Sequence, residues 1–422
     1  MARAQGARAQ MALGFESIYG MPPAANSFWK IPFASSSLGS EQPLLGSELL
    51  GYGRDPLAPV KDAITADGDV VVPIDARAFG IWLKGAFGAP ITTTVKATGS
   101  IVFAVNPSAG DTITLNGSVW TFVTGVPAGS ETQIGLTLAA TLTQLVTDLN
   151  ASADTEIAKC TYGEADGTTL TIEFDTAGTT GNDFTLAASA AMPSASSLGG
   201  GGFSHEFQSG SWTLPSMSIE TGMPDVPRFA MYSGCVVDQM SWTMQRSGLL
   251  TASVSVVAQQ EVNATVSVAG TLEALDLLRF GHFNGAIRRN DVDLCSVVST
   301  QISYSNNLDR IETICDGGKI GGADPSIAAL TGSMVVRFAD TTLLDQAVEG
   351  EPCELEFSYT LVSGEKLTIT AHAVYLPKPR ISIEGPGGVQ ATFAWQAARD
   401  ELLGRMCTIT LVNDMPNFDN PA

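Results

Sequence analysis

The residue types that most often carry catalysis or bind metals are scarce and scattered in this sequence. Only three histidines occur, His205, His282 and His372, and no two of them lie within reach along one helix or hairpin. Metal ligation and triad chemistry need such groups brought together, so the spacing predicts neither. His205 lies beside a glycine-rich stretch and His372 in an alternating strand, and we interpret both as structural or solvated.

The carboxylate and glycine motifs likewise predict no catalytic or metal-binding site. Asp67-Gly-Asp69 and Asp291-Val-Asp293 could touch a cation, but no twelve-residue calcium loop surrounds either pair. The glycines of 51–53 and 385–388 predict turns, because neither stretch lies between a strand and a helix. No nucleophile elbow, zinc-binding helix or phosphate-binding loop is present. The sequence therefore predicts no enzyme, no cofactor and no metal site.

Composition limits the possible partners. The net charge is −21 and charged residues make up only 15%, with no cluster of lysine and arginine that could neutralise phosphates. An acidic surface can still let DNA slide past, or can simply keep an abundant protein soluble. No apolar run reaches the roughly 18 residues of a membrane span, and the first ten residues do not resemble a signal peptide. We therefore expect reduced, mostly buried thiols at the six cysteines Cys160, Cys235, Cys295, Cys315, Cys353 and Cys407.

An internal repeat organises the chain. Residues 68–75 and 332–340 each begin at a glycine turn, continue as a β-branched strand and end in an aspartate placed to cap a helix. Both predicted helices end at glycine, Gly88 and Gly350. Glycine is frequent, 43 residues in all, and the alternating Ser, Thr and Val pattern favours β-structure. A mainly β fold of two duplicated modules, each with a flanking helix, is expected.

Features on both sides of the repeat extend it. A long loop precedes each repeated strand, Leu44 to Val60 and Asp316 to Ile327, with the steps Asp55-Pro56 and Asp324-Pro325. Alternating strands follow each helix. We match 235–242 with 389–395, and 250–256 with 406–411. The alternative is chance alignment of short Val-rich runs.

The first copy is longer because residues 96–190 change character to Thr, Ala, Asp and Gly. Asn116-Gly117 predicts a hairpin, and a leucine stripe from Leu138 to Leu149 predicts a helix. Two lysines against ten acidic residues give this segment a net charge of −8. The stretch Ser196–Gly202 predicts a flexible linker. The expected domains are a first module (1–95 and 203–265), an inserted α+β domain (96–202) and a second module (266–422).

Three stretches together resemble the tail tube proteins of long-tailed, siphovirus-type bacteriophages. They are Trp29–Gly39, Trp212–Glu220 and the region from Asn307 through Gly332 to Asp345. The resemblance covers nearly all the chain outside the insert, which is itself similar to small modules appended to phage virion proteins. It implies β-barrel or β-sandwich modules with a flanking helix, and neither cofactor nor catalytic residues.

The resemblance also implies a function. The subunit would assemble with itself into stacked rings, forming a tail tube that conducts DNA during ejection. Its partners would be the tape measure protein and DNA in the lumen, and terminator and baseplate proteins at the ends. It would be made in the host cytoplasm and located in the virion tail, without membrane contact. Two other readings remain: a terminator or baseplate ring component, or a carbohydrate-binding adhesion module.

Site residues follow from this expectation. Two fused modules should close a ring as a trimer with pseudo-sixfold symmetry, the alternative being a hexamer with the second half as an accessory domain. Small acidic residues should line the lumen, with Glu220 and Asp238 as candidates. Contact between rings should come from the two long loops, through Leu44, Leu45, Leu49, Leu50, Tyr52, Arg54, Asp55, Lys319 and Asp324.

Overall fold

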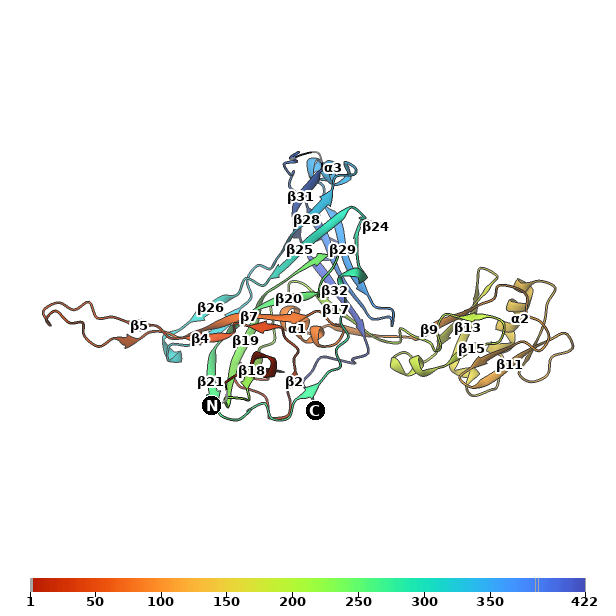
Figure 1. Ribbon diagram of the computed structural model, residues 1–422, viewed down its shortest axis with the longest axis horizontal. Helices are drawn as coiled ribbons and strands as arrows, with labels where there is room; N and C mark the ends of the chain where they lie inside the picture. Colours follow the sequence, from red (N-terminus) through yellow and green to blue (C-terminus); the bar gives the residue numbers. More distant parts are fainter. Residues whose placement is uncertain (1–2, 384, 386, 422) are drawn as a thin grey trace.

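The computed structural model describes residues 3–383, 385 and 387–421, and strands dominate it (Figure 1). Three α-helices occur in this described part: α1 (Ala78–Phe87), α2 (Leu138–Asn150) and α3 (Thr342–Glu349). A central body carries a long hairpin on one side and a separate lobe on the other. The sheets of the described residues stay open rather than closing into a barrel. The prediction of a mainly β fold is confirmed.

The first module is one antiparallel set of six strands. Across the sheet the order is β1–β18–β19–β20–β7–β3/β4. Helix α1 lies in the chain between β7 and β18. The strands are β1 (Gln10–Phe15), β3 (Ser35–Ser36) continued by β4 (Gly39–Glu41), β7 (Thr65–Pro73), β18 (Met217–Met223), β19 (Arg228–Gln245) and β20 (Thr251–Ala258).

The second module repeats this order as β23–β29–β30–β31–β28–β25. Helix α3 lies between its third and fourth strands along the chain, as α1 does. The same number of residues separates Gly68 from Gly332 and Ala78 from Thr342. The strands are β23 (Gly285–Arg289), β25 (Val297–Ser305), β28 (Ala329–Arg337), β29 (Cys353–Thr360), β30 (Lys366–Tyr375) and β31 (Gln390–Ala398).

Identical strand order and connectivity support duplication, but both predicted strand correspondences, 235–242 with 389–395 and 250–256 with 406–411, are wrong. The segment 389–395 was matched to 235–242, whereas β31 pairs with β28 just as β20 pairs with β7. The counterpart of β31 is therefore β20, and the counterpart of β19 is β30. Alternation alone could not distinguish these strands, because β20, β30, β31 and β32 all bury every second residue over most of their length.

The two modules join into one sheet. Strand β19 is long enough to pair with β20 on one side and, along Gln239–Gln245, with β25 of the second module on the other. Both modules share one hydrophobic core. The remaining strands of the body are β2 (Trp29–Lys30), β8 (Ile91–Val95), β17 (Gly202–Gln208), β21 (Gln260–Ala264), β22 (Glu273–Ala274), β24 (Val292–Asp293) and β32 (Cys407–Asn413).

Both repeated helices begin and end as predicted. Asp75 Oδ1 accepts hydrogen bonds from the backbone N–H groups of Arg77 and Ala78, each 2.8 Å, and Asp340 Oδ1 accepts one from Thr342 at 2.9 Å. These carboxylates satisfy N–H groups that the helix itself leaves unpaired. At the other ends Gly88 and Gly350 have φ of 90° and 76°, a region that favours glycine.

Asp75 should make stability depend on pH. Burial raises its pKa to about 6, although the hydrogen bonds from Arg77 and Ala78 oppose this. A group whose pKa rises on folding stabilises fully below its unfolded value, about 4, and loses that contribution as pH rises through its folded value. Between pH 4 and 7 we expect the free energy of unfolding of the wild type to fall by on the order of 3 kcal/mol relative to that of the Asp75→Asn variant, which keeps the accepting oxygen. Chemical denaturation measures this; a constant difference would contradict it.

The inserted lobe has a core of its own, built only from residues between Ala97 and Leu198. Two four-stranded sheets enclose it with α2, whose predicted stripe is buried at Leu142, Leu145 and Leu149. The predicted hairpin turn is present, with positive φ at Asn116 and Gly117. The strands are β9 (Thr98–Val102), β10 (Thr112–Leu115), β11 (Ser118–Val123), β12 (Glu131–Gln133), β13 (Cys160–Ala165), β14 (Thr169–Phe174), β15 (Leu186–Ala188) and β16 (Met192–Pro193).

The glycine-rich stretch at the end of the insert is not the predicted flexible linker. Leu198 is buried in the insert core, and Gly199 exchanges two backbone hydrogen bonds with Thr98. Gly201 is held by the side chain of Asn182 in both directions, at 2.9 and 2.8 Å. Composition favours flexibility here, but a backbone that finds partners for its polar groups becomes fixed.

The cysteines agree with expectation. All six are free; Cys160, Cys235, Cys353 and Cys407 are buried, and Cys295 and Cys315 are exposed. Among the described residues no helix is long and apolar enough to cross a membrane.

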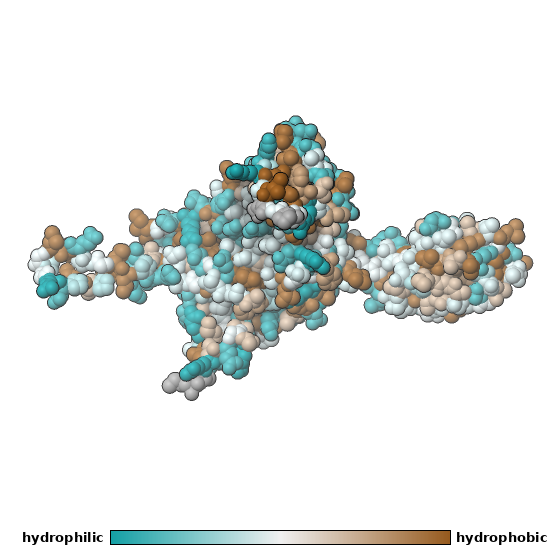
Figure 2. Space-filling model, turned by 45° about the horizontal axis from the view of Figure 1, so that its top comes forward, coloured by the Kyte–Doolittle hydropathy of each residue, from teal (hydrophilic) through white to brown (hydrophobic). Residues whose placement is uncertain are grey.

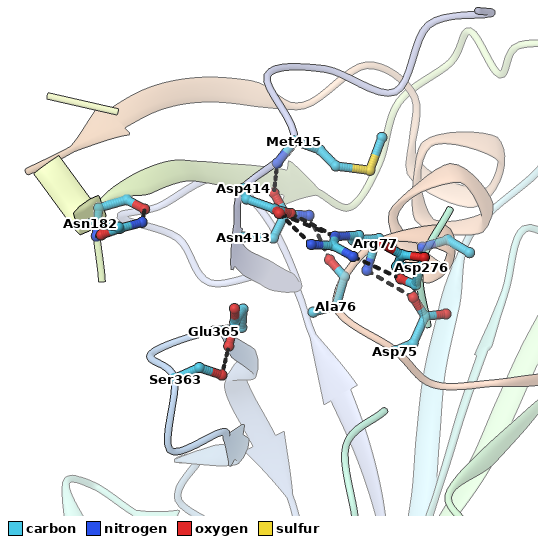
Figure 3. A network of polar contacts seen from close by, with 12 residues as sticks. Asp75, Ala76, Arg77, Asn182, Asp276, Ser363, Glu365, Asn413, Asp414 and Met415 are labelled. Atoms are coloured by element: carbon cyan, nitrogen blue, oxygen red, sulfur yellow. Dashed lines mark hydrogen bonds and ion pairs between the residues drawn. The ribbon is translucent and has the colours of Figure 1, made fainter. Parts of the chain in front are cut away.

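The C-terminal segment fastens the end of the chain to α1 (Figure 3). Arg77 donates to both carboxylate oxygens of Asp414, at 2.9 and 2.5 Å, and this pairing lowers the pKa of that carboxyl. Phe418 is 1% exposed and lies so close to Gly80 that a Cβ there would meet its ring at 2.2 Å. Lys84 pairs with Asp419 at 2.6 Å. The chain after β32 thus ties the second module to the helix of the first.

Candidate functional site: a polar sheet face and an apolar arm

The joined sheet buries one face in the core and presents the other to solvent. Neighbouring strands place outward residues in register, so that Ser253, Ser241, Ser303, Thr331 and Gln396 form one row across five strands. The register continues this row to Val71 on β7. We call this surface the polar face; its other members include Ser255, Gln239, Ser305, Thr243, Gln301, Ser333, Ala394, Gln245, Ser299, Val335 and Thr392.

Hydroxyls and amides dominate the polar face, and the charged residues Asp69 and Arg337 lie near its margins. Gln239 Nε2 donates to Ser303 Oγ at 2.7 Å, a bond that crosses from one module to the other. The face is hollowed over β25, β28 and β31, where a depression of about 650 Å³ is lined by Gln301, Thr331 and Gln396 among others. A surface made mainly of hydroxyl and amide groups gives phosphate groups few strong binding partners.

The two predicted lumen acids are used inside the subunit. Glu220 is only 4% exposed, and its carboxylate accepts hydrogen bonds from Ser267 Oγ and from the N–H groups of Val268 and Ala269. Within the subunit, its carboxylate holds the loop of residues 267–269. Asp238 lies at a register shift in β19, where Oδ1 accepts from the Leu308 N–H at 2.9 Å. A buried carboxylate needs such donors, and sequence alternation gave no sign of them.

The first long loop is an arm that projects from the body (Figure 1). A short hairpin, β5 (Leu44–Leu45) with β6 (Val60–Lys61), forms its stem. Apolar side chains cover it, and Figure 2 shows them as brown atoms among polar ones. Leu50 is 94% exposed, and the others are Leu44, Leu45, Leu49, Tyr52 and Val60. So much apolar area in water is costly, and a partner that covers it gains correspondingly.

The second long loop is shorter and is bound to the base of the arm. It forms a hairpin of β26 (Asp309–Glu312) and β27 (Ile320–Asp324). Its Gly318 carbonyl accepts a hydrogen bond from Ile64 N–H at 2.7 Å, and Arg310 pairs with Asp67 at 2.6 Å. The two loops therefore lie together on one side of the body.

The predicted loop residues divide accordingly. Arg54 and Asp55 lie on the exposed arm with the leucines. Lys319 instead donates to the side chain of Gln260 in the body, and Asp324 ends β27 opposite Asp309. The polar face was missed altogether. Its signal was present as Ser, Thr or Gln at every second position of 239–245, 251–255 and 299–305, and at three of the four such positions of 390–396.

The histidines have structural surroundings. His205 is fully buried between Thr92, Asn413 and the Met415 carbonyl, and burial lowers its pKa. His372 contacts Glu354 and Thr408. Within the described part of the chain, no group of three or more His, Cys, Asp or Glu side chains is placed to hold a metal.

Comparison with known proteins identifies one matching family. No curated protein matches the chain. The family model described as "phage tail tube protein" matches residues 6–397, which includes both modules and the insert. A match of this extent, together with the mainly β fold, shows that the chain belongs to the phage tail tube protein family.

Proposed function

We propose that this chain is the structural subunit of the tail tube of a siphovirus-type phage, and that it assembles into stacked rings through which DNA is ejected. The observation that carries the proposal is the polar face, a surface of mainly hydroxyl and amide side chains that continues across both modules and is hollowed over the second. Facing inward, it would form a channel wall on which DNA finds few favourable phosphate contacts. The tape measure protein would occupy this channel before ejection, and terminator and baseplate proteins would cover the tube ends.

Ring symmetry follows from the duplicated modules. Because the two modules have the same strand order, one chain supplies two quasi-equivalent segments of wall. Three chains then close a ring with pseudo-sixfold symmetry. A hexamer, with only one module on the wall, would leave half of the polar face outside the channel.

The arm supplies contact between rings in this proposal. It is too long for a simple hairpin and exposes apolar side chains over its whole length. Loops held by a rigid scaffold commonly carry function. We assign Leu44, Leu45, Leu49, Leu50, Tyr52, Arg54 and Asp55 to this contact, with Lys319 and Asp324 acting at its base.

Negative-stain microscopy of the purified protein tests the assignment. Tubes support a tail tube subunit, whereas single rings that never stack would indicate a terminator or baseplate component. Monomers that remain dispersed at high concentration would contradict both.

The insert should be dispensable for assembly. We propose the domain division 1–95 with 203–265, 96–202 and 266–422, supported by the separate insert core. Because Val95 and Gly202 are partners in the β8–β17 pair, an Asn-Gly turn can join them. Residues 96–201 should be removed together, since ending the deletion at Ala190 would leave the buried Leu198 without its core.

We expect the deletion variant to form tubes with the yield and the channel diameter of the wild type. The outer surface of these tubes should lack the lobe. Electron microscopy of the variant measures both. A variant that folds but fails to form tubes would place the insert in a subunit interface instead of on the outer wall.

A further inference from the structure

The strand pairing that joins the two modules within one chain gives a pattern for a junction between two chains. Along Gln239–Gln245, strand β19 of the first module pairs with β25, the strand at the edge of the second module. In the second module the place of β19 is taken by β30, and in the first module the place of β25 is taken by β3/β4. A repeat of the junction would therefore pair the end of β30 with β3/β4.

Both of these edges lack a strand neighbour on that side. Strands β3 and β4 pair with β7 and, among the described residues, with no other strand. Strand β30 pairs with β31 only along Ala373–Tyr375 and then ends, and residues 376–383 continue without regular structure. By contrast, β19 continues beyond the corresponding position and pairs with β25 as far as Gln245.

Features at each edge limit pairing in the free subunit. Pro377 and Pro379 remove two backbone donors from the segment after β30. At the other edge the Ser40 N–H donates to the carboxylate of Glu261 at 3.2 Å. Proline and side-chain cover are the usual protection of edge strands against indiscriminate pairing.

The two edges also carry opposite charges. Glu41 is exposed on β4, and Lys378 and Arg380 are exposed on the segment after β30. Within the part of the chain that the structure describes, neither Glu41 nor Lys378 has an ion-pair partner. Opposite charges on matching surfaces favour and orient association.

We propose that the ring closes when β4 of one chain pairs with the segment after β30 of a second copy, so that Glu41 meets Lys378 and Arg380. Each ring then alternates the junction seen within the chain with the same junction between chains. This rests on the proposed function, because it assumes that the subunit forms rings.

Cysteine cross-linking tests the pairing directly. The exposed Cys295 and Cys315 are first replaced by serine, and Glu41→Cys is combined with Lys378→Cys. After assembly and oxidation, denaturing electrophoresis without reductant should show a ladder that ends at three chains. The matched control combines Glu41→Cys with Lys366→Cys, an exposed position at the other end of β30; it should give no ladder.

The outcomes separate the two proposals. Tubes that form normally but give no ladder with the Glu41/Lys378 pair, or an equal ladder with the control pair, would overturn the edge pairing and leave the tube function standing. Failure of the unsubstituted protein to form tubes or rings would overturn the function itself.

Charge reversal gives an independent readout. Glu41→Lys alone should lower tube yield about tenfold, the effect of roughly 1.4 kcal/mol, and combining it with Lys378→Glu and Arg380→Glu should restore the yield. A yield that the triple variant does not restore, with each variant folded by circular dichroism, would contradict the pairing.

Discussion

Replacing residues 46–59 with Asn-Gly should give a subunit that folds normally and forms no tubes. The replacement closes the stem on the Leu45–Val60 pair, so β5 and β6 remain joined by a two-residue turn. It removes no member of the shared core, and thermal unfolding should be unchanged. What it removes is the apolar cover of the arm, which we expect the neighbouring ring to bury.

A milder variant allows the contribution of the arm to tube formation to be quantified. Leu49→Ser with Leu50→Ser removes two leucines that are 67% and 94% exposed. At roughly 2 kcal/mol for each leucine buried on assembly, the concentration needed for tube formation should rise by on the order of several hundredfold. Sedimentation of tubes across a concentration series measures this.

The matched control lies on the insert. Val126→Ser with Leu136→Ser removes two apolar side chains that are 91% and 102% exposed, outside any proposed contact. This variant should assemble like the wild type. If the variant with residues 46–59 replaced formed tubes of normal length, the arm would not take part in the contact between rings.

Three lysines placed in one row of the polar face should stop DNA passage without stopping assembly. Ser241→Lys, Ser303→Lys and Thr331→Lys lie side by side on β19, β25 and β28. None belongs to the buried core, so tubes should still form. Each cation that meets a phosphate releases counterions and binds more tightly at low salt, with a slope of about −0.9 per contact.

Particles that carry this variant should therefore adsorb normally and release their genome slowly or not at all, with partial recovery at high salt. Genome release from purified virions measures the effect. The control places three lysines on exposed positions of the insert, Gln133→Lys, Thr147→Lys and Thr179→Lys. Release at the wild-type rate by the row variant would show that the polar face does not line the channel.

Local signals in the sequence predicted local structure well. The Asp75 and Asp340 caps, the terminal glycines Gly88 and Gly350, and the Asn116-Gly117 turn each act through bonds to residues nearby in sequence. Such signals need no knowledge of the rest of the fold. The leucine stripe of α2 was equally clear, because one face of a helix recurs at fixed spacing.

Features that depend on distant partners were not predictable in the same way. Glu220 was expected to line the lumen, and the backbone of residues 268–269 that binds it lies nearly fifty positions away. The glycines that end the insert are fixed by Thr98 and Asn182, not by their own composition. Strand correspondence between the modules required the pairing order, which alternation does not contain.

One measurement tests the central claim most directly: a cryo-microscopy reconstruction of the assembled tube, with subunits per ring counted and the channel wall traced. Three chains per ring, with Ser241, Ser303 and Thr331 facing the lumen and both modules on the wall, is the result that we predict. Six chains per ring, or a second module away from the channel, would contradict it.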